Sequence, residues 1–222
     1  KPKIGNILDW SLTMKFFKFF KKKNNEKEDI LSQMIDHFID VATVEIAGKL
    51  QDMFNQPIII NNMVKSMIDI TELPMLIGNE EDTAISVIFE IENEIQGKIA
   101  ILISNAGAKN LYNLLTQKNI ENIEEKKGYL LPEVSSCIES VASIFAMTFV
   151  SAISNFIQKP IFTSVPVISY SYRDSVINEI VIDQTNSDDS LEIYISKFLI
   201  ENIEGYFLFV PKYVNYLNLG SE

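Results

Sequence analysis

The stretch from Pro132 to Pro160 constrains the fold more than any other part of the chain, because it predicts one long helix with a proline at each end. Proline is accepted in the first turn of a helix, whereas Pro160 has no N–H and disfavours helical geometry at the residue before it. Between the prolines, apolar side chains recur at spacings of three and four residues: Val134, Ile138, Val141, Phe145, Phe149, Ala152 and Phe156. This stripe predicts a face packed on a core, and a second face then carries Ser135, Glu139 and Ala142.

A second segment, from Glu28 to Pro57, repeats this plan. It has a similar length, ends in Gln-Pro where the later segment ends in Gln-Lys-Pro, and is followed by an apolar run. Aligning the two terminal prolines pairs the positions of the second face: Ser32 with Ser135, Asp36 with Glu139, and Ile39 with Ala142.

The segments between the helices repeat as well. Phe89 to Ser104 and Phe198 to Pro211 both contain two Ile- and Val-rich or aromatic runs around a turn. A repeat spacing of roughly a hundred residues is too long for a solenoid and suits a duplicated unit within one domain. We therefore predict an α/β (α+β) fold in which two long helices pack on a mostly antiparallel sheet, with halves at about 28–117 and 130–212 of a single domain, 26–222.

The remaining elements are predicted from local patterns. A helix is expected from Ala106 to Gln117, with Asn105 as its cap. Strands are expected at Thr83–Glu92, Gln96–Ser104, Ile161–Tyr172, Ser175–Asp183, Leu191–Ile200 and Gly205–Val210.

The first 25 residues differ from the rest in charge. Lys1 to Asn25 holds seven lysines against Asp9, about +6, which leaves about −17 for the remainder of a chain whose net charge is −11. Its aromatic residues fall at helical spacing, which predicts a basic amphipathic helix. Such a helix can lie in a membrane interface, bind a groove on a partner, pack on the acidic body of its own chain, or serve as a linker. The acidic body argues against nucleic acid as a partner, because it repels phosphate.

Cysteine use and hydropathy bear on the compartment. Cys137 is the only cysteine, so no internal disulfide forms and a reducing, cytoplasmic location is expected. Such a cysteine is more commonly a small buried apolar residue than a nucleophile. No uninterrupted apolar run reaches the ~18 residues that span a bilayer, so a membrane partner is not expected.

Catalytic constellations are scarce. His37 is the only histidine, which argues against a His-rich metal site. Beside Asp36 and Asp40 it could act as a general base, although a histidine on a helix is more commonly a partly exposed polar residue. The chain contains no Gly-rich phosphate loop and no EF-hand spacing. We expect no cofactor and no metal bound by the chain itself.

The two helices and the hairpins resemble the CheC/CheX/FliY family of bacterial chemotaxis phosphatases. The segment SSCIESVASIFAMTFVSAISNFIQKPIFTSVPVI is similar to the second signature helix of that family and the strand after it, and the resemblance extends from about Glu28 to Pro211. The family motif is Asp or Ser, then Glu four residues later, then Asn three residues after that, with a proline further on. Ser135 and Glu139 match it, and Pro166 lies near the expected proline.

The sequence departs from the motif at the asparagine, where it has Ala142 in the second half and Ile39 in the first. The resemblance implies that the glutamate of this family engages the lysine of a phosphorylated response regulator. It also implies that the asparagine amide orients the attacking water. Phosphoryl transfer depends on such positioning, and a methyl group cannot hold a water. The resemblance thus implies catalytic positions at Ser32, Asp36, Ser135 and Glu139 in a degenerate motif.

Three functions follow as hypotheses. The first is binding of a CheY-like response regulator, or another chemotaxis or flagellar protein, through Asp36, Asp40, Glu139 and Ser143, with weak or absent phosphatase activity. The second is an active phosphatase in which Ser143 or Asp40 replaces the asparagine; Mg²⁺ would arrive with the regulator. The third is a dimerisation module of a larger regulator, and a homodimer is compatible with all three.

Overall fold

The computed structural model describes residues 27–69, 73, 83–93, 95–182 and 190–212, and the side chains of the first long helix from Phe38 onward. The basic segment predicted at residues 1–25 lies outside the described residues. The elements are α2 (Lys27–Phe54), β1 (Ile58–Ile60), β2 (Val64–Asp69), β3 (Thr83–Asn93), β4 (Gln96–Ser104), α4 (Asn105–Thr116), β5 (Glu124–Lys126), β6 (Tyr129–Leu130), α5 (Pro132–Ile157), β7 (Ile161–Thr163), β8 (Val167–Tyr172), α6 (Arg173–Val181), β9 (Ser190–Ile200) and β10 (Ile203–Lys212).

Eight strands form one antiparallel sheet with the order β1-β9-β10-β4-β3-β7, in which β2 also pairs with β9 and β8 also pairs with β3. β4 and β10 pair at the centre. β1 and β2, which follow α2, pair with β9, whereas β7 and β8, which follow α5, pair with β3. The strand order is therefore symmetric about the central pair, and the predicted α+β arrangement of long helices on an antiparallel sheet is confirmed.

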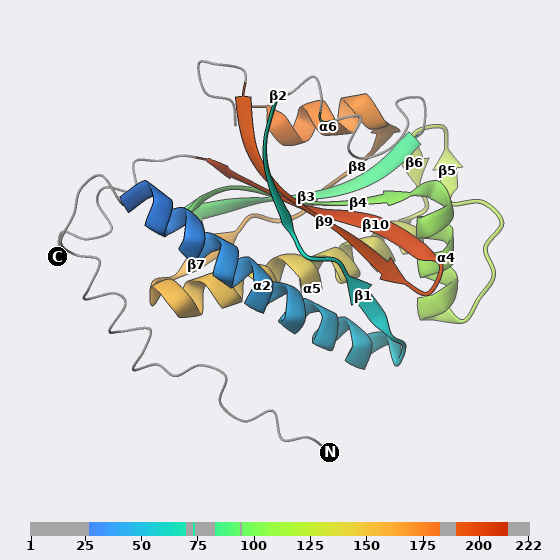
Figure 1. Ribbon diagram of the computed structural model, residues 1–222. Coiled ribbons are helices and arrows are strands. Elements are labelled where there is room, and N and C mark those ends of the chain that lie inside the picture. Colours follow the sequence, from blue (N-terminus) through green and yellow to red (C-terminus); the bar gives the residue numbers. More distant parts are fainter. Residues whose placement is uncertain (1–26, 70–72, 74–82, 94, 183–189, 213–222) are drawn as a thin grey trace.

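The helices divide between the two faces of the sheet (Figure 1). α2 and α5 pack against each other, and with α4 they cover one face over the larger core cluster. α6 covers part of the opposite face over a smaller cluster that includes Val176, Ile177 and Ile180. The sheet is thus a middle layer, and the outer surfaces of α2 and α5 are available to solvent.

α5 follows its sequence pattern closely. Val134, Ile138, Val141, Phe145 and Phe149 are all at most 3% exposed. Phe145 and Phe149 pack against aromatic rings of β9 and β10, mostly in tilted arrangements. The helix ends at Ile157, and the backbone of Gln158 takes the left-handed conformation that caps it two residues before Pro160.

Composition alone makes α5 a candidate membrane helix, contrary to the expectation from uninterrupted apolar runs. Pro132–Asn155 is long enough to cross a bilayer and has a mean hydropathy of 1.7, but 56% of it is buried inside the fold. A core helix of a folded domain passes the same test, and the burial of its apolar stripe gives α5 that role.

Two local predictions were wrong. The strand predicted at Ser175–Asp183 is instead part of α6, because its buried residues Val176, Ile177, Ile180 and Val181 recur with helical spacing. The ammonium of Lys98, on β4, donates to the carbonyls of Glu179 and Ile182 at 3.0 Å each, which stabilises the C-terminal end of that helix.

The second wrong prediction concerns the cap of α4. The Oγ atom of Ser104 accepts a hydrogen bond from the backbone N–H of Gly107 at 3.1 Å, so Ser104 is the N-cap. Asn105 is instead the first residue of the helix, and its side chain bonds elsewhere.

Candidate functional site

The N-terminal half of α5 carries the candidate site, and a small hairpin fixes where this helix begins. β5 and β6 pair directly before it, and the backbone N–H of Leu131 donates to the carbonyl of Ile123 at 2.8 Å. Pro132 stands in the first turn, where its missing N–H removes no helical bond. Glu133 in the same turn is favourable for the positive end of the helix dipole.

Ser135 and Glu139 lie together on one face of this helix. The hydroxyl of Ser135 donates to Oε1 of Glu139 at 3.4 Å, a long hydrogen bond between side chains one turn apart. Both residues are half-buried. Ser143 follows one further turn along, is also half-buried, and therefore shares this face by its spacing of four residues from Glu139. The face offers one carboxylate between two hydroxyls.

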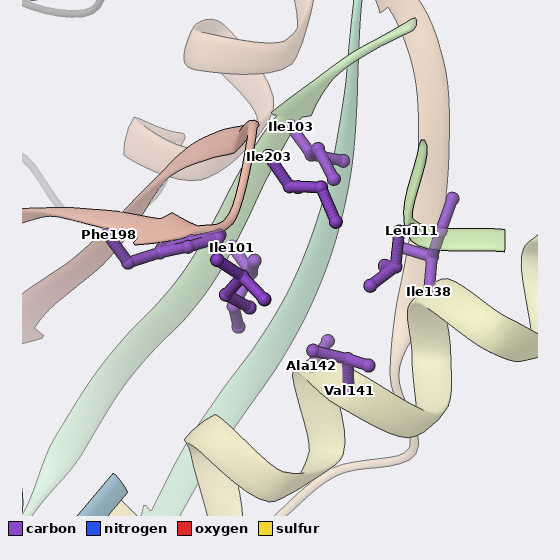
Figure 2. Close-up of a pocket in the computed structure, with 9 residues that line it drawn as sticks. Ile101, Ile103, Leu111, Ile138, Val141, Ala142, Phe198 and Ile203 are labelled. Atoms are coloured by element: carbon purple, nitrogen blue, oxygen red, sulfur yellow. The ribbon is translucent and has the colours of Figure 1, made fainter. Parts of the chain in front are cut away.

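Ala142 does not belong to that face, so its predicted position beside Glu139 is wrong. It is 1% exposed, and the aligned Ile39 on α2 is 2% exposed. Figure 2 shows Ala142 beside a small pocket between α5 and the sheet, lined by Ile101, Ile103, Leu111, Ile138, Val141, Ala142, Phe198, Ile200 and Ile203. All of these side chains are hydrocarbon, so the pocket is a packing defect of the core and holds no group for chemistry.

The predicted residues of α2 are only partly described. Asp40 is exposed on the outer surface of this helix, which packs beside α5. Ser32, Asp36 and His37 belong to the first part of α2, and their side chains lie outside the described residues. The structure therefore brings Ser135, Glu139 and Ser143 together on α5 and puts Asp40 on the neighbouring helix.

The exposed residues of α5 beyond its first turn are uncharged. Ser136, Ser140, Met147 and Ser151 are exposed, with Met147 at 62%. Glu139 is thus the single charged side chain of α5 beyond its first turn. Within α5, the carboxylates that an approaching cation can meet are those of Glu139 and of Glu133 in the first turn.

Cys137 lies two residues from both Ser135 and Glu139, which puts it on another side of α5, and it is half-buried. Burial raises the pKa of its thiol, and the nearby carboxylate of Glu133 raises that pKa further. A raised pKa keeps the sulfur in the unreactive thiol form at neutral pH, in line with a packing role. Among the residues that the structure describes, no group of three or more His, Cys, Asp or Glu side chains is arranged to hold a metal ion.

A polar network at the edge of the sheet was not predicted from the sequence. The amide of Asn105 donates to Thr83 at 2.8 Å and to the hydroxyl of Tyr170 at 2.9 Å. The Tyr170 hydroxyl donates in turn to the carboxylate of Glu124 on β5. Burial first, and then this bond, raises the pKa of Tyr170. The four residues are up to 87 positions apart in the chain, so no local sequence pattern predicts the network. Its hydrogen bonds link β8 to the hairpin that positions α5.

Comparison with known proteins identifies the fold. No protein-family model matches the sequence, and no curated protein is significantly similar to it in sequence. FliY from Thermotoga maritima is similar in structure, with 13% identity and a TM-score of 0.60 over 89% of this chain and 96% of that one.

Two chains from complexes are similar as well. One is from the FliG–FliM complex of H. pylori, with 10% identity and a TM-score of 0.57 over 84% of this chain and 93% of that one. The other is from the CheX–CheY–BeF3–Mg complex of Borrelia burgdorferi, with 14% identity and a TM-score of 0.55 over 79% and 98%. The chain has the fold of these proteins, so the resemblance found in the sequence is confirmed at the level of the fold.

Proposed function

We propose that this protein is a chemotaxis-type signalling protein that binds the receiver domain of a CheY-like response regulator through the outer face of α5, with weak or absent phosphatase activity. The observation that carries the proposal is the contrast between Glu139 and Ala142. Glu139 presents a carboxylate beside Ser135 on an accessible helix face, whereas the position of the water-orienting asparagine is occupied by a methyl group in the core.

The binding half of the proposal rests on the fold and on Glu139. The resemblance implies that a glutamate in this position pairs with the lysine of the receiver, and a chain of the same fold is present in a complex with CheY. The sequence of α5 also favours such a pair, because this helix contains no Lys or Arg that competes for the Glu139 carboxylate. A cytoplasmic location and Mg²⁺ carried by the receiver follow as parts of the same proposal.

The catalytic half rests on Ala142. Phosphoryl transfer to water needs an oriented nucleophile, and removal of one oriented donor typically costs about 10²–10³ in rate. The side chain of Ala142 has no donor, is buried, and lines the apolar pocket between α5 and the sheet. The Glu139 face alone therefore supports docking better than turnover.

A charge reversal tests the binding half. Glu139→Lys should abolish saturable binding of a BeF3⁻-activated CheY-type receiver, because it sets two cations against each other. Glu201→Lys is the matched control, because it makes the same change in net charge. Glu201 is an exposed acid in the turn between β9 and β10. Isothermal titration should give equal affinities for the wild type and the control. Equal affinities for all three proteins would overturn the proposal.

A second candidate, an active receiver phosphatase, is favoured by Ser143 alone. Its hydroxyl shares the face of Glu139 and is capable of holding a water. The loss of phosphate from a phosphorylated CheY-type receiver separates the two candidates. Under the main proposal the protein leaves the loss rate unchanged; catalytic acceleration that Ser143→Ala removes would establish the second candidate.

A further inference from the structure

The basic segment from Lys1 to Asn25 has no role in the proposed receiver site, and its seven lysines against Asp9 give it a charge of about +6. A helix over this segment would place two kinds of side chain on different sides. The large apolar side chains of one side are Trp10, Met14, Phe17 and Phe20. The cations of the other side are Lys15, Lys18 and Lys22. This pattern suits a surface that combines acidic charge with exposed apolar side chains.

The layer formed by α2 and α5 is such a surface. Its two helices hold eight Asp and Glu residues against two cations, Lys27 and Lys49, which gives a net charge of −6. Large apolar side chains are exposed on the same helices, with Val44 of α2 at 73% and Met147 of α5 at 62%. The helix layer therefore offers both carboxylates and apolar contact area to a basic aromatic segment.

Other surfaces with exposed apolar side chains lack this charge. β2 exposes Val64 and Met67, but its one acid, Asp69, is balanced by Lys65. The stretch 161–172, which contains β7 and β8, holds no charged residue. α6 carries two acids and one arginine. Charge complementarity therefore favours the helix layer as the surface that attracts the segment.

The connection of the segment to α2 puts the two surfaces close together. The segment leads into α2, which begins at Lys27 and packs against α5. α2 and α5 run in opposite directions, so the chain enters α2 beside the C-terminal end of α5 (Figure 1). A segment that returns along the helices has to turn before Lys27, and Asn24 and Asn25 are residues that favour turns.

The length of the segment is sufficient to reach Glu139. As a helix, its 25 residues would span about 38 Å, whereas the path along α5 from Ile157 back to Glu139 is about 27 Å. Because the segment is tethered to the domain, its effective concentration at this surface is high, in the millimolar range for a short flexible connection.

We propose that residues 1–25 dock on the outer surface of α2 and α5 of the same chain, with the lysines on the carboxylates and the aromatic side chains on Val44 and Met147. The docked segment covers Glu139 and competes for it with the lysine of a receiver. The competition rests on the proposed function, whereas the docking does not. The segment is thus a built-in inhibitor of the receiver site.

Paramagnetic relaxation tests the docking without any receiver. The full chain, labelled with ¹⁵N, carries a nitroxide on Ser11→Cys, and Cys137→Ser removes the native thiol. The amide signals of Val44 and Met147 should broaden, whereas those of α6 on the opposite face of the sheet should not. The broadening should be the same at every protein concentration, because the contact is within one chain. Broadening that grows with protein concentration would overturn the proposal, since it indicates docking on a second copy.

Matched charge variants test the competition. The segment variant reverses one cationic side with Lys15→Glu, Lys18→Glu and Lys22→Glu. The control makes the same change in net charge at three exposed lysines outside α2 and α5, with Lys118→Glu, Lys127→Glu and Lys212→Glu. The segment variant should lose the broadening and bind a BeF3⁻-activated CheY-type receiver about tenfold more tightly than the wild type, as expected where the docked form is about ten times as populated as the open form. The control should keep both the broadening and the wild-type affinity.

Two further results would overturn the proposal. A segment variant that loses the broadening without any gain in receiver affinity would refute the competition. A wild type that shows no broadening and cosediments with vesicles of phosphatidylglycerol and phosphatidylcholine would make the segment a membrane anchor instead. If neither the wild type nor the variants bind a receiver, the proposed function fails, and the broadening still decides whether the segment docks.

Discussion

At the scale of single residues, Glu139 and Ala142 stand three positions apart on α5 and have opposite surroundings. The carboxylate of Glu139 is half-exposed and accepts a hydrogen bond from Ser135, whereas Ala142 is buried and lines a pocket of hydrocarbon side chains. An amide at position 142 would therefore lie in the core. Restoring the family asparagine at this site alone cannot restore an exposed water-orienting group.

Ala142→Asn should destabilise the protein. Burying an amide without hydrogen-bond partners costs about 1–3 kcal/mol, because the lining of the pocket offers none. Urea unfolding measures the loss, and Ser143→Asn on the half-buried polar face is the control, with a change expected near zero. An equally stable Ala142→Asn protein would mean that the helix is rotated from its described orientation.

The pairing of Ser135 with Glu139 was predictable from the sequence, because a spacing of four residues on a helix fixes which side chains meet. The burial of Ala142 was not. How much of the circumference of α5 is buried depends on where the sheet and α2 contact it. The apolar stripe of Val134, Ile138 and Val141 did not show whether Ala142, beside it on the helix, is buried or exposed. The polar network through Asn105 and Glu124 depends on tertiary contacts alone.

At the scale of elements, the hairpins rest on close approaches that only glycine permits. A Cβ on Gly205, on β10, would lie 2.2 Å from the ring of Phe198 and 2.6 Å from the carbonyl oxygen of Leu102. Gly97, on β4, has a φ of +153° and would meet the carbonyl oxygen of Val210 at 2.3 Å. Each glycine lies near the start of the second strand of its hairpin, so each lets the central strands pair in register.

Gly205→Ala should lower the free energy of unfolding by about 2 kcal/mol or more, because the Leu102 carbonyl belongs to the backbone and cannot move aside cheaply. Gly48→Ala is a control with the opposite expected sign. Gly48 is exposed on α2, and an added methyl group there meets nothing within 4 Å. The substitution should raise the free energy of unfolding by roughly 0.5–1 kcal/mol. Thermal unfolding of the two variants should move the midpoint in opposite directions. A stable Gly205→Ala protein would contradict the described strand pairing.

Most elements were predictable, since the long helices and the hairpins have strong periodic patterns. One element that was predicted wrongly, α6, is short and rich in Val and Ile, residues that favour strands by propensity. Its contacts with the sheet and the ammonium of Lys98 at its C-terminal end hold it as a helix. Both influences come from residues distant in sequence, which a local pattern cannot include.

At the scale of the whole molecule, the layered arrangement separates three surfaces. The α2 and α5 surface carries the Glu139 face, α6 covers part of the opposite sheet face, and β8 lies at one edge of the sheet within the described residues. The fold class followed from the sequence because apolar periodicity reports burial. Which strands form the edges of the sheet did not follow, because strand order is a property of the assembled sheet.

The central claim is that a receiver docks on the outer face of α5, and an NMR titration tests it most directly. The full chain labelled with ¹⁵N is titrated with an unlabelled, BeF3⁻-activated CheY-type receiver in Mg²⁺. Shift changes should concentrate at Ser135, Glu139 and Ser143 and be absent without BeF3⁻ if the partner recognises the activated state. Shifts confined to α6 or to the β8 edge, or no shifts at saturating receiver, would contradict the account.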